Sequence, residues 1–103
     1  MTKGTIICYT LGPNATQIQR NKLRKLLLGY KDISNNSQYE YFRDGLLTRI
    51  PSVGLVRSVF IVKKEDAEKV RLLLDEFCAT VHIREVTLTP DDCKTLGIAF
   101  NED

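Results

Sequence analysis

Residues 53–62 read Val-Gly-Leu-Val-Arg-Ser-Val-Phe-Ile-Val, and this stretch predicts the strongest strand in the 103-residue chain. Its apolar side chains fall on both faces of an extended chain, and only Arg57 and Ser58 interrupt them. A strand that is apolar on both faces is either covered on both sides or lies in a surface where two copies meet. The stretch therefore predicts a covered strand of a sheet or a self-association surface.

The segments around this stretch alternate between two patterns of apolar spacing. Short runs rich in β-branched residues are typical of strands, and runs with helical spacing are typical of amphipathic helices. Thr89 and Pro90 supply a cap and a first residue for a final short helix, which Gly97 should end. The other predicted elements are a strand at 5–11, a helix at 15–28, a polar loop at 31–37, a helix at 64–79 and a strand at 81–88.

Asp44-Gly45 predicts a β-hairpin between residues 38–43 and 46–50, because a two-residue hairpin turn favours positive φ at both turn positions. The resulting register places Glu40 opposite Arg49, which is a favourable cross-strand ion pair. A single long strand with a bulge at Gly45 is the alternative.

The order of these elements predicts an α+β fold, namely a ferredoxin-like βαββαβ sandwich. Two helices would cover one face of an antiparallel sheet, and a short C-terminal helix would follow. The second sheet face would stay open, where such folds commonly meet a partner, RNA or another copy of themselves. We expect residues 1–103 to form a single domain, with 98–103 as a flexible tail.

Composition excludes several classes of protein. Hydrophobic residues make up 43% and charged residues 27% of the chain, which is typical of a globular protein and unlike a disordered one. No apolar run reaches the ~20 residues that span a membrane, so we expect no membrane partner. The three cysteines are widely spaced, which indicates a reducing, cytoplasmic location, and Cys8 and Cys78 are expected to be core residues.

Catalytic and metal sites are weakly indicated. His82 is the only histidine, and Cys8 is its only candidate cysteine partner, but the apolar run around Cys8 predicts a buried thiol. Structural zinc needs four cysteine or histidine ligands. The sequence therefore favours a protein with no catalytic residues, no metal and no cofactor. A metal-dependent phosphodiesterase is the third-ranked alternative, with the candidate carboxylates Asp32, Asp44, Asp91 and Asp92.

The charge distribution carries the strongest functional signal. The formal net charge is +2, but residues 1–57 carry nine basic and three acidic residues, whereas residues 58–103 carry six basic and ten acidic ones. The first part therefore has a net charge of +6 and the second a net charge of −4. Such asymmetry indicates either polyanion binding or complementary self-association.

We therefore predict a small nucleic-acid-binding protein without catalytic activity, which holds RNA or DNA phosphates on its first helix and on the hairpin. Tyrosines of the hairpin are candidate platforms for base stacking. A homodimeric interaction or regulatory protein that uses the open sheet face is the alternative. The predicted nucleic-acid-binding residues are Arg20, Arg24, Lys31, Tyr39, Tyr41, Arg43, Arg49 and Arg57.

Overall fold

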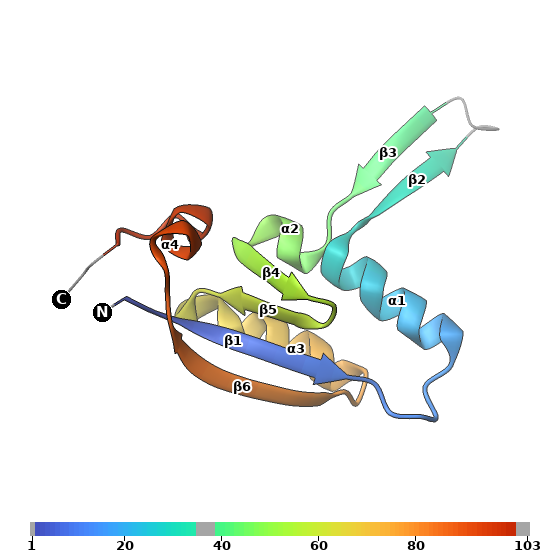
Figure 1. Cartoon of the computed structure of the whole chain (residues 1–103). Coiled ribbons are helices and arrows are strands. Elements are labelled where there is room, and N and C mark those ends of the chain that lie inside the picture. The colour runs from blue at the N-terminus through green and yellow to red at the C-terminus, as the bar shows by residue number, and fades with distance from the viewer. Residues whose placement is uncertain (1, 35–38, 101–103) are drawn as a thin grey trace.

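The computed structural model describes residues 2–34 and 39–100, and its main element is a four-stranded antiparallel sheet (Figure 1). The strand order across the sheet is β4-β5-β1-β6. Ile7 lies at the centre of the sheet, opposite Phe60 on one side and Ile83 on the other. The four strands are β1 (Lys3–Thr10), β4 (Ser52–Val56), β5 (Val59–Val62) and β6 (Thr80–Thr87).

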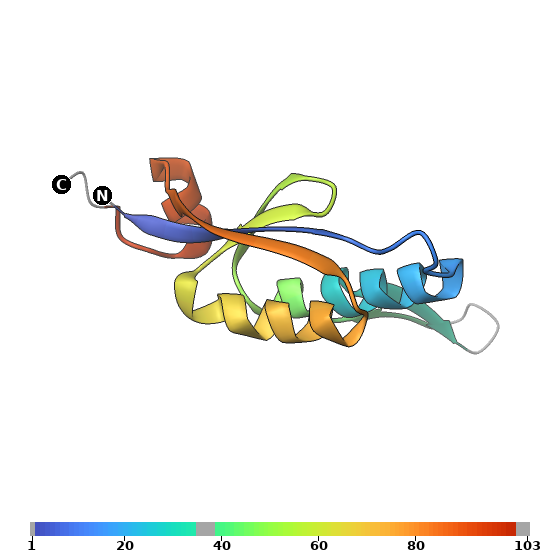
Figure 2. The ribbon, with the colours of Figure 1, turned by 90° about the horizontal axis from the view of Figure 1, so that it is seen from below.

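Two long helices cover one face of this sheet (Figure 2). These are α1 (Gln17–Leu28) and α3 (Ala67–Glu76), the latter preceded by a 3-10 turn, η1 (Lys64–Asp66). Helical spacing places the buried pair Leu23 and Leu27 on one side of α1, and Val70 and Leu74 on one side of α3. The main core therefore lies between these helices and the inward-facing residues of β1 and β5.

The second sheet face is partly covered, which corrects the expectation that it is open. Helix α4 (Pro90–Leu96) lies on the side of the sheet opposite to α1 and α3 (Figure 2). Its Cys93 and Leu96 form a second buried cluster with Ile61 and Leu88. The coverage follows from the chain turning back directly after β6, where Thr89 caps the new helix, as predicted.

The predicted mixed α+β class, with an antiparallel sheet and several helices, is confirmed. The element order departs from a plain βαββαβ chain, because three additional elements lie between α1 and β4. These are β2 (Tyr30–Ser34), β3 (Tyr39–Arg43) and the short helix α2 (Leu46–Arg49).

The hairpin predicted at Asp44-Gly45 is wrong. Strand β3 pairs with β2 instead, and Glu40 lies opposite Ile33 rather than opposite Arg49. Gly45 has a φ of −100°, so it does not take the positive φ that the predicted turn needs. It precedes α2, where the Thr48 hydroxyl accepts a hydrogen bond from the Gly45 N–H at 2.9 Å and donates one to its carbonyl at 2.7 Å. This local bonding favours a helical turn over a second strand.

The long strand predicted at residues 53–62 is a hairpin of β4 and β5. Arg57 and Ser58 form the turn, and Ser58 has a φ of 66°, in the left-handed region. The apolar character on both faces therefore comes from two short strands rather than from one strand covered on both sides.

Strands β2 and β3 form a separate two-stranded sheet, which we call the arm. The arm extends away from the main sheet at the end of α1 (Figure 1). Gly29 and Gly45 lie at its root, and a Cβ atom built on Gly45 would lie 2.2 Å from the Gly29 nitrogen. Gly29 has a φ of 77°, which only glycine adopts readily. Two glycines are therefore needed where the backbone enters and leaves the arm.

The predicted loop and tail lie partly outside the described residues. The first part of the loop predicted at 31–37 belongs to β2, and residues 35–37 are not described. The tail predicted at 98–103 begins with Ile98, which packs against the cluster around α4, whereas residues 101–103 are not described.

The cysteines differ from their predicted positions. Cys78 is exposed, which corrects its assignment to the core, and Cys8 is half-buried. Helix α3 ends at Glu76, and Cys78 takes a φ of 54° as the chain turns, so its side chain leaves the apolar stripe of the helix. Cys93 is the fully buried cysteine.

None of the helices within residues 2–34 and 39–100 is long and apolar enough to cross a membrane.

Replacing Thr89 with alanine should lower the free energy of unfolding by about 1 kcal/mol. The Thr89 hydroxyl accepts from the Asp92 N–H at 3.1 Å, and the Asp92 carboxylate accepts from the Thr89 N–H at 3.1 Å. Chemical denaturation followed by circular dichroism measures the loss. Thr95→Ala in the same helix is the matched control and should leave stability unchanged or slightly higher, since alanine favours the helix. Equal losses for both variants would contradict the capping role.

Candidate nucleic-acid interface

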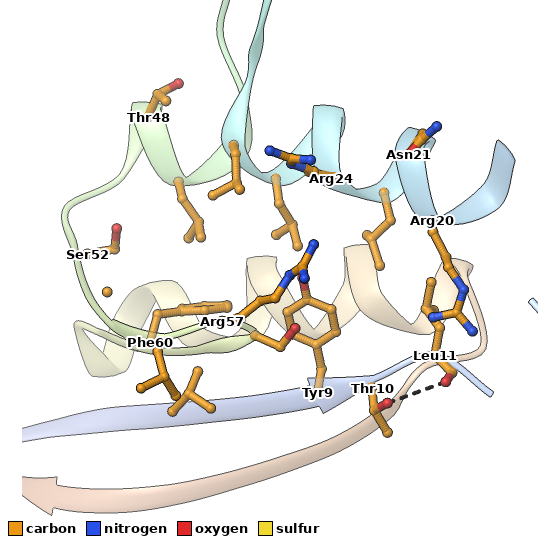
Figure 3. Close-up of a pocket in the computed structure, with 18 of the residues that line it drawn as sticks. Tyr9, Thr10, Leu11, Arg20, Asn21, Arg24, Thr48, Ser52, Arg57 and Phe60 are labelled. Atoms are coloured by element: carbon orange, nitrogen blue, oxygen red, sulfur yellow. Dashed lines mark hydrogen bonds between the residues drawn. The ribbon is translucent and has the colours of Figure 1, made fainter. Parts of the chain in front are cut away.

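A groove of about 870 Å³ lies between α1 and the β4–β5 hairpin (Figure 3). Helix α1 forms one wall, and the strands β4 and β5 with the turn between them form the other. The end of β1 and the helix α2 contribute the remaining lining residues. The groove thus joins four segments that are distant in the sequence.

The α1 wall follows from helical spacing. Residues at intervals of three or four fall on one side of a helix. Gln17, Arg20, Asn21 and Arg24 obey this spacing, and all four line the groove. Thr16 fixes the start of the helix, because its hydroxyl accepts from the Gln19 N–H at 3.1 Å. The structure therefore places Arg20 and Arg24 on the side of α1 that faces the groove.

The opposite wall brings a third arginine into the groove. Arg57 occupies the turn between β4 and β5, and its side chain extends toward α1, near Arg24 and Tyr9 in the view of Figure 3. Arg57 is 33 positions from Arg24 in the sequence, and the antiparallel pairing of β4 with β5 gives it this position. The structure thus brings together three of the eight predicted binding residues, Arg20, Arg24 and Arg57.

The floor of the groove is apolar. Phe60 is buried, and Tyr9 is half-buried beside it, with ring centroids 6.3 Å apart in an edge-to-face arrangement. Leu23 and Leu27 of α1 complete the floor. Leu23, Leu27 and Phe60 are almost fully buried, so the half-buried Tyr9 is the part of this floor that a ligand could contact.

The charge of the groove is unbalanced. Its lining holds three arginines and, among the residues that the structure describes, no aspartate or glutamate. Arg20 donates a hydrogen bond to the Gly12 carbonyl at 3.0 Å. Within residues 2–34 and 39–100, no carboxylate lies within 4.0 Å of the Arg24 or Arg57 guanidinium. Like charges repel, so an anion in the groove would relieve this repulsion.

Two basic residues in the acidic part of the chain, residues 58–103, form ion pairs with neighbouring carboxylates. Arg71 on α3 is bonded to both Glu68 and Asp75, and Lys69 pairs with Asp66 at 3.4 Å. The hydrogen bond to the Arg71 guanidinium lowers the pKa of the Glu68 carboxyl. Arg71 and Lys69 are thus paired with carboxylates, unlike Arg24 and Arg57 of the groove.

The remaining predicted binding residues do not line the groove. On the arm, Lys31 pairs with Glu40 at 2.9 Å, and Arg43 pairs with Asp32 at 3.1 Å. Tyr41 lies beside Arg43, whose guanidinium carbon is 5.9 Å from the ring centroid, and Tyr39 belongs to the same strand. Arg49 is exposed on α2, although Leu47 and Thr48 of that helix do reach the groove.

Sequence reasoning missed the floor and one end of the groove. Tyr9, Asn21 and Thr48 line it and were not predicted as site residues. The spacing of Asn21 from Gln17 and Arg24 could have indicated its position. No local signal marks Tyr9 or Thr48, because tertiary packing alone brings them to the groove.

Cys8 and His82 are cross-strand neighbours, which is the one thiol–histidine arrangement that the sequence offered. Cys8 lies directly opposite His82 on β1 and β6, on the sheet face away from the main core. The Cys8 thiol was expected to be buried, but Cys8 is only half-buried. In the described part of the chain no hydrogen bond joins the two side chains, and no group of three or more histidine, cysteine, aspartate or glutamate residues could hold a metal ion.

Comparison of the chain with known protein families, with curated proteins and with solved structures finds no match.

Proposed function

We propose that this protein binds single-stranded nucleic acid in the groove between α1 and the β4–β5 hairpin, without catalysing a reaction on it. The observation that carries the proposal is the convergence of Arg20, Arg24 and Arg57 in one groove whose described lining holds no acidic residue.

Arginine suits the phosphate groups of such a ligand. Its planar guanidinium offers several donors and can bond two oxygens of one phosphate. Arg24 and Arg57 approach the groove from opposite walls, so each could contact a different phosphate of one strand. Release of counterions from those phosphates would supply much of the affinity.

The apolar floor favours a single strand over a duplex. Unpaired bases can turn toward aromatic and aliphatic side chains, whereas the bases of a duplex are stacked inside it. Tyr9 is half-buried at the floor and presents an aromatic surface below the arginines. A flexible strand can place its bases there while its phosphates stay at the rim.

We also propose that the groove belongs to a ferredoxin-like core with an inserted arm. Without β2, β3 and α2, the order along the chain is β1-α1-β4-β5-α3-β6, with both long helices on one sheet face. In this reading the groove lies between the first helix and the central hairpin. The insertion then explains the additional elements.

A cytoplasmic location is part of the proposal. Cys8, Cys78 and Cys93 are free thiols, and proteins of oxidising compartments tend to pair their cysteines.

Fluorescence anisotropy with labelled single-stranded and duplex RNA and DNA of equal length tests the proposed function. We expect single strands to bind more tightly than duplexes. The logarithm of the binding constant should fall with the logarithm of salt concentration with a slope of about −2, as three phosphate contacts on a single strand require. Absence of binding at low salt would overturn the proposal, and a tighter duplex complex would overturn its single-strand part.

A further inference from the structure

The arm is a two-stranded ribbon that is separate from the main sheet. Strands β2 and β3 pair with each other, and neither pairs with a strand of the main sheet in the described parts of the chain. Figure 1 shows the arm extending away from the main sheet. An isolated two-stranded hairpin is marginally stable in water. The arm therefore gains stability if another surface covers it.

One face of the arm carries its two most exposed apolar side chains among the described residues. Side chains alternate along a strand, so Lys31, Ile33, Glu40 and Phe42 share one face in the observed register. On this face, which we call the Ile33–Phe42 face, the two apolar residues are 52% and 60% exposed. Two large apolar side chains with this exposure on one short ribbon form a concentrated apolar surface.

The charges of the arm argue against a polyanion as the covering partner. The described strands carry two basic and two acidic residues, and all four are joined in the ion pairs Lys31–Glu40 and Asp32–Arg43. The arm is therefore neutral, and binding to phosphates would first have to break these pairs. A protein surface that itself carries apolar groups and paired charges matches the arm better than a polyanion does.

The Ile33–Phe42 face is complementary to itself. In a two-fold symmetric contact, residue i of one copy meets residue j of the other, and j meets i. Lys31 and Glu40 carry opposite charges on this face and flank the apolar pair. Two such faces can therefore pack with Lys31 of each copy near Glu40 of the other, while Ile33 and Phe42 of both copies are buried between them.

We propose that a second copy of this chain docks on the arm, with the Ile33–Phe42 faces of the two arms packed together. This interface does not include the arginine groove, so the proposal is independent of nucleic-acid binding. It also differs from a dimer through the second face of the main sheet, because α4 already covers part of that face.

Sedimentation velocity of the full chain, with two matched variants, tests this interface. Ile33→Lys places a lysine opposite Glu40, which preserves a favourable pair within the arm but gives both faces a like charge. Ile18→Lys makes the same change on α1, where Ile18 is 80% exposed. We expect dimers for the wild type and Ile18→Lys. The dimer dissociation constant of Ile33→Lys should rise roughly tenfold or more, because two buried isoleucines are lost.

A mixing experiment separates docking from a merely structural role of the arm. Lys31→Glu makes the face acidic in every copy, and Glu40→Lys makes it basic, so each variant alone should be a monomer. A mixture of the two should form heterodimers, because unlike charges then face each other across the interface. Circular dichroism confirms that each variant is folded.

Three results would overturn the docking proposal. The first is a wild-type chain that stays monomeric up to its highest soluble concentration. The second is a dimer that Ile33→Lys leaves as tight as the wild type, or that Ile18→Lys weakens as much. The third is that arm variants keep the wild-type oligomeric state but lose nucleic-acid binding. This result would show that the arm contacts the nucleic acid rather than a second copy of the chain.

Discussion

The double variant Arg24→Glu/Arg57→Glu should bind single-stranded nucleic acid roughly a hundredfold more weakly than the wild type. Each arginine is expected to contribute a hydrogen bond to a charged phosphate, worth about 1.5 kcal/mol. Reversing the charges adds repulsion between the groove and the strand. Anisotropy titrations at constant salt measure the loss, and the salt slope should fall as phosphate contacts are removed.

Arg49→Glu is the matched control for the groove. It makes the same change of charge on the same basic half of the chain, but Arg49 is exposed on α2 and does not line the groove. We expect Arg49→Glu to weaken binding far less than either groove substitution does alone. If it weakens binding as much, affinity depends on overall charge and the groove is not the site. Thermal unfolding of each variant should match the wild type, since none of these arginines is buried.

Replacing Gly45 with alanine should lower the free energy of unfolding by about 3 kcal/mol. The new Cβ atom would lie 2.2 Å from the Gly29 nitrogen and 2.6 Å from the carbonyl carbon and oxygen of Leu27. All three atoms belong to the backbone, so no side-chain rotation can relieve the clash. The clash would force the root of the arm away from α1, and this separation is the structural cause of the lower stability. Urea unfolding measures the loss of free energy.

Gly12→Ala is the control for this prediction. Among residues 2–34 and 39–100, no atom lies within 4 Å of a Cβ atom built on Gly12, and the φ of Gly12 lies outside the left-handed region. The substitution should leave stability unchanged or raise it by about 0.4–1 kcal/mol, because alanine restricts the unfolded chain. Wild-type stability of Gly45→Ala would show that the two backbone segments do not touch.

The part of the site on α1 was predictable because helical spacing is a local property. Arg20 and Arg24 lie one turn apart, so the sequence alone places them on one side of the helix. The contribution of Arg57 was predicted without its location, since only the pairing of β4 with β5 brings their turn to α1. The floor of the groove was not predictable, because it depends on packing between distant segments.

The hairpin prediction was wrong because glycine can be required either for a positive φ or for a close approach of two backbone segments. Asp44-Gly45 is a strong turn signal when glycine is needed for its positive φ. Here Gly45 has an ordinary φ and is needed because its missing side chain lets two backbone segments touch. Because β3 pairs with β2 rather than with residues 46–50, the charged residues of the arm have other partners than predicted. Lys31 was expected to be available for phosphate but lies opposite Phe42 and pairs with Glu40.

The root of the arm also links the two proposed surfaces. Only Gly29 separates α1 from β2, and Gly45 approaches Gly29 closely. The arm therefore begins where the helix that carries Arg20 and Arg24 ends. Two copies joined by their arms, as proposed above, would carry two grooves in one assembly. A strand long enough to reach both would then gain affinity through effective concentration, without any new contact.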